Sequence, residues 1–229
     1  MKRLIIIPAF NESENIVNTV KDIQKKAPDF DYVVINDHSR DNTLELLQEN
    51  HFNYVDLPVN LGIGGAVQTG YKYAYENGYD EAVQVDADGQ HDVSYLKDLV
   101  NKLESENADM VIGSRFINNE GFQSTFMRRV GIVYFNKLIH LLTGTRITDP
   151  TSGFRLGNRK VIEHFAKSYP RDYPEPESTV YLLKRGMKVV EEPVQMRARQ
   201  GGVSSIRMGA SVYYMVKVTL AILIENIRK

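Results

Sequence analysis

The stretch LIIIPAFNESENIVNTVKDI, residues 4–23, contains one complete strand–loop–helix unit. Leu4 to Ile7 form a short apolar run that ends at Pro8, which predicts a buried strand. Asn11 and Glu14 then follow with the spacing of a capping pair, which predicts that a helix starts beside them. The apolar residues of that helix recur at helical spacing: Ile16, Val17, Val20 and Ile23.

The same unit recurs through the first half of the chain. Further buried strands are predicted at residues 32–35, 54–57, 82–85 and 110–112, and further helices from Leu44, over 62–75 and from Leu96. Repeated units of this size predict an α/β fold, in which a doubly wound, mostly parallel sheet lies between two layers of helices. Beyond residue 115 we expect a mobile loop over 117–131 that runs into a helix, with that helix placed over 126–142. We also expect a proline-containing loop over 168–178 before a short helix, and an edge strand over 189–194 broken at Pro193.

The composition excludes several classes of protein. The 229 residues include 28 basic and 29 acidic residues, so the chain offers no general positive field for nucleic acid. Cysteine is absent, which excludes a disulfide scaffold, thiol catalysis and a cysteine zinc site. The longest apolar stretch, 212–224, is interrupted by Lys217 and falls short of the ~20 residues that a membrane span needs. We therefore expect a cytoplasmic protein, soluble or peripheral to the membrane.

Four polar loops follow the predicted strands, at residues 8–12, 36–41, 60–65 and 86–91. Ligands of an open α/β sheet bind beyond the carboxyl ends of its strands, so we expect these loops to meet at one edge. In an extended backbone the carboxylates of Asp86 and Asp88 would project to the same side, and Gln90 follows them. Such an oxygen-rich site suits Mg²⁺ or Mn²⁺. Asp and Gly also favour turns, but the three neighbouring polar loops favour the site.

Other motifs narrow the chemistry. The predicted helix over 62–75 begins with three glycines: Gly62, Gly64 and Gly65. They can place backbone amides near a phosphate, or they can allow close packing of the helix on the sheet. They follow the third strand with the wrong spacing for a dinucleotide fingerprint, which disfavours a dehydrogenase. The five histidines lack the spacing of a zinc hydrolase, and no Gly-x-Ser-x-Gly elbow occurs.

The chain resembles family 2 glycosyltransferases of the GT-A fold, and within them the polyprenyl-phosphate sugar synthases of the dolichyl-phosphate mannose synthase type. The matching segments, in order, are IIIPAFNESENI (5–16), VVINDHSRDNT (33–43), NLGIGGAVQTGYKYA (60–74), VQVDADGQHD (83–92), VIGSRF (111–116), DPTSGFR (149–155) and the stretch to 229. The resemblance implies an inverting enzyme of cell-envelope glycan synthesis. It would move a hexose or N-acetylhexosamine from a nucleotide sugar, with UDP favoured, to a polyprenyl phosphate at the cytoplasmic face of the membrane.

The resemblance also implies roles for individual residues. The nucleotide sugar would be bordered by Pro8, Phe10, Asn11, Glu12, Asp37, Gly62, Asp86, Ala87, Asp88, Ser114, Arg115 and Arg199. A Mg²⁺ or Mn²⁺ ion would be bound by Asp86, Asp88 and Gln90; the catalytic residues would be Asp88, Asp149 and Arg155; and the acceptor would meet Arg128, Arg129, Ser152 and Arg155. The chain departs from the family at Asn36, where a second aspartate is common, and at Ser205, where the family often has lysine.

A lipid phosphate acceptor fits these residues chemically. The second pKa of a phosphomonoester is about 6, so the acceptor is largely dianionic at neutral pH and needs little help from a base. It needs cationic groups that hold it against a second negatively charged substrate. The arginines available for this task are Arg115, Arg128, Arg129, Arg155 and Arg199. Arg128 and Arg129 would equally suit the solvated face of a helix.

The C-terminal stretch bears on the acceptor as well. We expect a GT-A domain over 1–205, with a nucleotide-sugar half (1–115) and an acceptor half (116–205), and an amphipathic helix over 206–229. One side of that helix is apolar: Val212, Met215, Val216, Leu220, Leu223, Ile224 and Ile227. The apolar side can lie in the membrane interface, pack on the core or contact a partner. Together with the helix over 126–142 it would form an interfacial platform.

Two other functions stay open at this point. The chain can be a family 2 transferase that acts on a saccharide or protein acceptor, in which case it needs a general base. It can also be a non-catalytic subunit that binds a nucleotide sugar and regulates a membrane protein, although Asp86, Asp88 and Arg155 are intact. For the transferase to polyprenyl phosphate we expect peripheral membrane contact, either direct or through a small integral membrane partner, and we leave homo-oligomerisation open.

Overall fold

The structure is a computed structural model that describes residues 1–118, 126–171, 174–197 and 210–227, without the side chains of 126–128, 210–214 and 225–227. Its strands are β1 (Arg3–Ala9), β2 (Asp31–Asn36), β3 (Tyr54–Asp56), β4 (Glu81–Gln84), β5 (Met110–Ser114), β6 (Arg155–Asn158) and β7 (Val189–Pro193). Its helices are α1 (Ile16–Lys26), α2 (Thr43–Glu49), α3 (Gly62–Glu76), α4 (Leu96–Ser105), α5 (Phe126–Thr143), α6 (Arg159–Lys167), α7 (Pro174–Lys184) and α8 (Ala210–Ile227), with a 3-10 turn over Val93–Tyr95.

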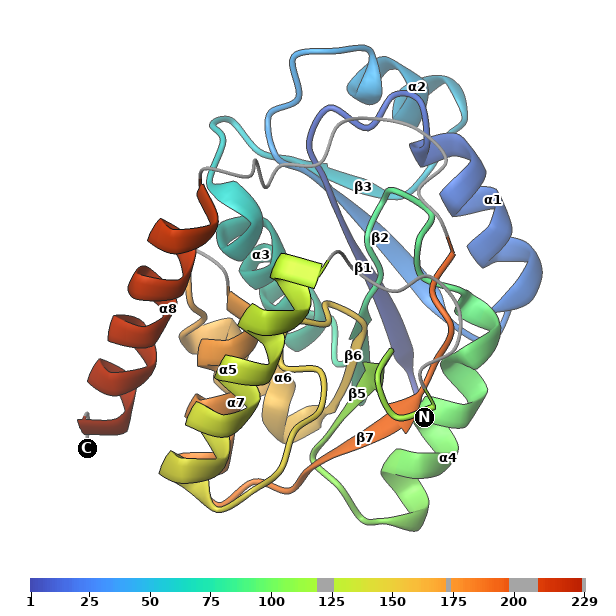
Figure 1. Ribbon diagram of the computed structural model, residues 1–229. Coiled ribbons are helices and arrows are strands. Elements are labelled where there is room, and N and C mark those ends of the chain that lie inside the picture. The colour runs from blue at the N-terminus through green and yellow to red at the C-terminus, as the bar shows by residue number, and fades with distance from the viewer. Residues whose placement is uncertain (119–125, 172–173, 198–209, 228–229) are drawn as a thin grey trace.

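The strands form one seven-stranded sheet in the order β3-β2-β1-β4-β6-β5-β7 (Figure 1). β1 pairs in parallel with β2 and β4, and β5 pairs in parallel with β7. β6 runs antiparallel between β4 and β5. The predicted mostly parallel α/β sheet is therefore confirmed, and the strand that ends at Pro193 lies at an edge as predicted.

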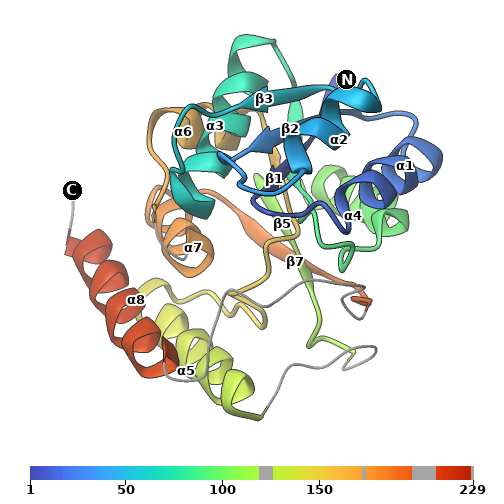
Figure 2. The same ribbon diagram turned by 90° about the horizontal axis from the view of Figure 1, so that it is seen from above.

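Each face of the sheet carries its own apolar core, because successive side chains of a strand point to opposite faces. Ile5 and Ile7 of β1 belong to a core that includes residues of α1 and α4. Leu4 and Ile6 belong to the other core, which includes residues of α3, α5, α6, α7 and α8. The helices accordingly lie on both sides of the sheet (Figure 2).

The neighbouring strands β1 and β4 separate at Pro8. The C=O of Ile6 accepts a hydrogen bond from the Val85 N–H at 2.9 Å. In a parallel ladder the next bond on this side would need an N–H at Pro8, which proline lacks. Pairing of β1 with β4 stops there, while pairing of β1 with β2 continues to Ala9 and Asn36. The loop after β4 is thereby free to leave the sheet.

Two local predictions are wrong, and one strand was not predicted. Asn11 does not cap a helix: its φ is 56°, its Oδ1 accepts from the Arg40 N–H at 2.8 Å, and α1 begins only at Ile16. The proline-containing segment 168–178 is not all loop, because α7 begins at Pro174 and the first turn of a helix tolerates proline. The four-residue strand β6, which begins at the last residue of the DPTSGFR segment, was not predicted from the sequence.

The described residues contain no helix whose length and apolar character would let it cross a bilayer.

Candidate functional site

The loops after β1 and β2 are tied together by side-chain hydrogen bonds. The Asn11 N–H donates to Ser39 Oγ at 3.0 Å, and the Glu12 N–H donates to Thr43 Oγ1 at 2.9 Å. Phe10, the residue before Asn11, is exposed, whereas Pro8 is buried in β1. The two polar loops therefore form one edge, as the sequence predicted, with an aromatic ring open to a ligand.

Asp37 connects this edge to the start of α3. Its side chain is buried, and Oδ1 accepts from the Leu61 N–H at 2.6 Å. Burial raises the pKa of Asp37, although hydrogen bonds from the backbone of Leu61 and Gly62 act in the opposite direction. One oxygen of the Asp37 carboxylate is thus occupied by a hydrogen bond within the protein.

The glycines of α3 serve packing more than phosphate binding. A Cβ on Gly64 would lie 2.1 Å from the Pro170 O, and the Gly64 N–H already donates to the Arg171 O at 3.1 Å. A Cβ on Gly70 would lie 2.1 Å from Ile6 Cγ2 of the sheet. Gly62 has a φ of 75° and open space around it, and its N–H donates to Asn60 Oδ1 at 3.2 Å.

The loop after β4 presents the carboxylate of Asp86. The Asp86 N–H donates to His91 Nδ1 at 3.0 Å, which places the proton of a neutral imidazole on Nε2, 3.6 Å from Asp86 Oδ2. His91 is itself buried and stacks on Phe154 with ring centroids 5.0 Å apart. The Asp86 side chain remains 39% exposed and also accepts from Gln84 Nε2 at 2.9 Å. His91 thus orients an aspartate that faces solvent.

Asp88 lies in different surroundings from Asp86, and the backbone between them forms a turn instead of the extended strand that the sequence predicted. β4 ends at Gln84, and Gly89, with a φ of 73°, completes a turn. The Asp88 carboxylate is buried, accepts from the Gln90 N–H at 3.1 Å and lines a pocket of about 190 Å³ next to α1. Ala87 is buried between the two aspartates, and its C=O accepts from Thr19 Oγ1 at 2.8 Å.

Arg197 contacts the C-terminal end of the loop after β4, at Gln90 and Asp92. Its N–H donates to the Gln90 O at 2.9 Å, and its guanidinium bridges Asp22 at 3.1 Å and Asp92 at 2.7 Å. The Gln90 side-chain amide donates in turn to the Arg197 O at 3.4 Å. Arg199, the predicted phosphate ligand, lies outside the described residues.

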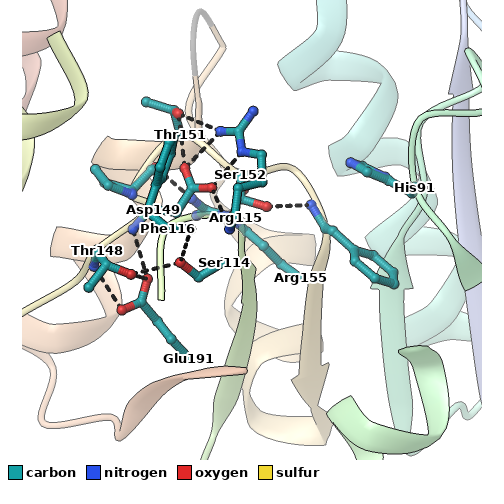
Figure 3. A network of polar contacts seen from close by, with 12 residues as sticks. His91, Ser114, Arg115, Phe116, Thr148, Asp149, Thr151, Ser152, Arg155 and Glu191 are labelled. Carbon is teal, nitrogen blue, oxygen red and sulfur yellow. Dashed lines mark hydrogen bonds and ion pairs between the residues drawn. The ribbon is translucent and has the colours of Figure 1, made fainter. Parts of the chain in front are cut away.

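Arg115, just beyond the end of β5, is held by Asp149 (Figure 3). Nε of Arg115 donates to Asp149 Oδ2 at 2.6 Å, and Nη2 donates to Asp149 Oδ1 at 2.8 Å and to Thr151 Oγ1 at 3.0 Å. Asp149 is fully buried, whereas Arg115 keeps 16% of its side chain exposed. The buried aspartate therefore fixes the direction of a partly exposed guanidinium.

Glu191 of β7 is a site residue that sequence reasoning missed. Its carboxylate accepts from the Thr148 N–H at 2.7 Å, the Asp149 N–H at 2.8 Å and Thr148 Oγ1 at 3.0 Å (Figure 3). Burial raises the pKa of Glu191, and the amides of Thr148 and Asp149 oppose that rise. Glu191 thus supports the backbone from which Asp149 reaches Arg115.

Ser114, which was predicted to border the nucleotide sugar, and Ser152, which was predicted to meet the acceptor, are both internal. Ser114 is buried with its Oγ 2.7 Å from Thr148 Oγ1, and Ser152 is buried with its Oγ accepting from the Phe154 N–H at 3.3 Å. Both hydroxyls shape the backbone of the site.

Arg155 is buried and its guanidinium is already engaged. It donates to three backbone carbonyls, those of Ser152 at 2.5 Å, Glu175 at 2.6 Å and Pro150 at 2.7 Å. It also donates to the hydroxyls of Ser178 and Thr179, each at 3.0 Å. An acceptor phosphate would have to displace these contacts, so the structure opposes the expectation that Arg155 meets the acceptor. Its geometry is that of a residue that holds the 149–155 turn on α7.

A second pocket, of about 630 Å³, lies beside the Arg115–Asp149 pair on the side of α5. Among the described residues, its charged and polar lining includes Arg129, Arg146, Asn136 and Thr148, and its apolar lining includes Phe116, Ile132 and Val133. Arg129 is exposed, which suits both a ligand-binding arginine and the solvated face of a helix, while the side chain of Arg128 lies outside the described residues. The pocket combines positive charge with apolar surface.

The residues present fit a Mg²⁺ or Mn²⁺ ion of the kind that a nucleotide helps to bind. Such ions take one or two protein carboxylates and complete their shell with phosphate oxygens and water. Asp86 offers an exposed carboxylate held by His91, whereas the Asp88 carboxylate is buried and bonded to the Gln90 N–H. No three His, Cys, Asp or Glu side chains among the described residues gather closely enough to hold an ion by themselves.

Comparison with known proteins supplies the wider context. The sequence profile described as Glycosyl transferase family 2 matches residues 4–165. The UDP-N-acetylglucosamine--dolichyl-phosphate N-acetylglucosaminyltransferase of Methanococcus voltae is 27% identical over an alignment of length 233. The alignment covers 92% of this chain and 92% of that protein. The polyprenol monophosphomannose synthase of Mycolicibacterium smegmatis is 29% identical over 215 residues, which cover 90% of this chain and 81% of that protein.

The fold is shared with a solved structure. Glucosyl-3-phosphoglycerate synthase from Mycobacterium tuberculosis, in complex with Mn²⁺, UDP and glucosyl-3-phosphoglycerate, superposes with a TM-score of 0.73 at 18% identity, over 98% of this chain and 79% of that chain. At that identity the likeness concerns the fold, and it agrees with the GT-A sheet expected from the sequence.

Proposed function

The chain belongs to glycosyl transferase family 2, and from that premise we propose that it transfers a hexose or N-acetylhexosamine from a nucleotide sugar to a polyprenyl phosphate. UDP is the nucleotide we favour. The two relatives named above act, by their names, on dolichyl phosphate and on a polyprenol monophosphate. They differ in the sugar that they transfer, so the proposal extends to the class of acceptor and leaves the sugar open.

The observation that carries the proposal is the pocket next to Arg115 and Asp149. A lipid phosphate has an anionic head and an apolar chain, and the pocket offers Arg129 and Arg146 together with Ile132 and Val133. A saccharide acceptor would instead call for a general base, and the described lining of the pocket contains no carboxylate and no histidine. The lining therefore favours an amphiphilic anion over a sugar.

The proposed reaction needs few protein groups. An oxygen of the acceptor phosphate forms a bond to the anomeric carbon as the bond from that carbon to the diphosphate breaks, and a nucleoside diphosphate leaves. No proton is transferred, because the attacking phosphate is dianionic. Arg115, fixed by Asp149, stands at the carboxyl edge of the sheet to neutralise phosphate charge.

Asp37 and Phe10 would border the base at the other end of the donor, since they lie on the edge formed by the β1 and β2 loops. Asp86 is the residue that would hold Mg²⁺ or Mn²⁺, and Asp88 would support the turn behind it. A bound divalent cation would supply charge stabilisation for the leaving diphosphate.

The test is a screen of radiolabelled UDP-sugars and GDP-mannose against a polyprenyl phosphate, with the product extracted into organic solvent. Label in the organic phase that depends on both the lipid phosphate and Mg²⁺ or Mn²⁺ is the expected result. The matched control replaces the lipid phosphate by the free polyprenol. Equal transfer to the free alcohol, or transfer only to saccharides, would contradict the proposal. Donor binding without any turnover would favour the non-catalytic alternative.

A further inference from the structure

α5 and α8 lie side by side at one edge of the molecule, far from α1 and α4 (Figures 1 and 2). The Tyr134 hydroxyl of α5 is 3.1 Å from Thr219 Oγ1 of α8, which links the two helices directly. Both helices also reach the core: Phe135 and Ile139 of α5 and Val218 and Ile222 of α8 are buried in it. The pair is therefore an integral layer of the fold.

Both helices also carry large apolar side chains on the side away from the core. These side chains are 38% to 81% exposed, and we call them the outer face: Val130, Val133 and Leu141 of α5, and Val216, Leu220, Leu223 and Ile224 of α8. The four residues of α8 follow the spacing of one helical stripe. Tyr134, itself 39% exposed, lies where the two helices meet. Single exposed apolar residues are ordinary, but a group of this size marks an interaction surface.

The two helices of the outer face carry more basic than acidic residues. α5 contains Arg128, Arg129 and Lys137 and no aspartate or glutamate. α8 contains one basic residue, Lys217, and one acidic residue, Glu225. The whole chain, by contrast, has one more acidic than basic residue. Positive charge beside an apolar stripe is complementary to anionic lipid head groups, which attract lysine and arginine side chains near the membrane surface.

The outer face runs into the pocket described above. Val133 belongs to the outer face and also lines the pocket. Arg129, one helical turn earlier in α5, lines the pocket as well. Thr148, on the inner wall, is bonded to Glu191 and precedes Asp149. A molecule lying along the outer face could thus reach the Arg115–Asp149 pair by way of the pocket.

We propose that the outer face of α5 and α8 docks on an anionic lipid bilayer, with both helices lying in the plane of the interface. A second copy of the chain would fit this face less well, because a symmetric contact would bring the basic residues of both faces, Arg129 and Lys137 among them, into one interface. Under the proposed function, this orientation turns the pocket toward the head-group layer, where the phosphate of a polyprenyl phosphate lies.

The test uses flotation of the full chain with two kinds of vesicle, phosphatidylcholine alone and phosphatidylcholine with phosphatidylglycerol at roughly 7:3. The wild type should bind the anionic vesicles, and raising the salt from about 50 mM to about 500 mM should weaken that binding. The double variant Leu220→Glu/Ile224→Glu should lower the affinity for anionic vesicles by at least about tenfold. Asn101→Glu/Ser105→Glu is the matched control, since it adds the same charges at the same spacing on exposed positions of α4, on the other side of the molecule.

Three results would overturn the docking proposal. The first is equal binding of the wild type to both kinds of vesicle, and the second is an equal loss of affinity for anionic vesicles in both double variants. The third is a dimer in lipid-free solution that the Leu220→Glu/Ile224→Glu substitutions dissociate, while neither the wild type nor the variant binds vesicles.

A short-chain, water-soluble prenyl phosphate separates this proposal from the proposed function. The Leu220→Glu/Ile224→Glu variant should transfer sugar to it as the wild type does, yet fail with long-chain acceptor in vesicles. If the wild type binds vesicles as expected but no acceptor is glycosylated, the docking proposal stands and the proposed function falls.

Discussion

Asp149 holds Arg115 by two parallel hydrogen bonds, and only the arginine of this pair reaches the surface. Burial alone would lower the pKa of Arg115, but the hydrogen bonds and charge of Asp149 outweigh it and leave that pKa raised. The guanidinium is therefore permanently charged, and its plane is set by a residue 34 positions later in the chain.

The first prediction concerns that pair. Arg115→Lys should keep the charge but lose the planar two-bond contact with Asp149, so we expect transfer to fall by at least about tenfold while the protein remains folded. Turnover and the affinity for the nucleoside diphosphate are the quantities to measure. Arg185→Lys at the end of α7 is the control, because Arg185 instead stacks on Tyr181. Normal turnover in Arg115→Lys would remove Arg115 from the donor site.

Glu191→Gln tests the support behind the pair. An amide offers one acceptor oxygen where the carboxylate has two, so its NH₂ group would face the Thr148 or Asp149 N–H. We expect the free energy of unfolding to fall by roughly 1–3 kcal/mol and kcat to fall more than the affinity for the donor changes. Glu192→Gln is the matched control, since successive residues of β7 point to opposite sides. If the two variants behave alike, Glu191 has no special role in positioning Asp149.

The sequence indicated the sheet and its polar edge because these depend on local patterns. The apolar run Leu4–Ile7 and the polar residues after it predict a strand and its loop without knowledge of any partner. Glu191 could not be found in this way, since its partners Thr148 and Asp149 are 43 and 42 positions distant. The 149–155 motif likewise identified Arg155 as a significant residue, but residue type alone does not reveal that its side chain points inward.

The two aspartates of the β4 loop should behave differently. Asp86→Asn removes the exposed carboxylate, so we expect the apparent affinity for Mn²⁺ in the presence of nucleotide to fall, and turnover with it. Asp88→Asn changes a buried carboxylate that holds the Gln90 N–H, so its main effect should be on stability. Mn²⁺ titrations of transfer and thermal unfolding of both variants distinguish these effects. An unchanged Mn²⁺ titration in Asp86→Asn would exclude Asp86 as a metal ligand.

The Arg197–Asp92 ion pair should make stability depend on pH. Burial tends to raise the pKa of Asp92, but hydrogen bonds from Arg197 and Ser94 outweigh it, so the pKa lies below its usual value in the folded protein. A carboxyl with a lowered pKa stabilises the fold above its unfolded pKa of about 4, and that contribution is lost as the pH falls through the folded pKa. We expect Asp92→Asn to lower Tm at pH 7, and we expect the Tm difference from the wild type to shrink steadily as the pH falls below about 4 toward the folded pKa. A Tm difference that is independent of pH would contradict this origin.

Arg155→Lys tests whether the buried arginine serves the fold or the acceptor. Lysine has three N–H donors at one point, so it cannot reach the carbonyls of Pro150, Ser152 and Glu175 together. Each buried carbonyl left without a donor costs roughly 1–3 kcal/mol, so we expect a clear loss of stability. Donor hydrolysis and transfer to lipid phosphate should then fall in parallel, and both should recover at a temperature where the variant is folded. An Arg155→Lys protein with normal unfolding and normal hydrolysis, but without transfer, would instead show that Arg155 meets the acceptor phosphate.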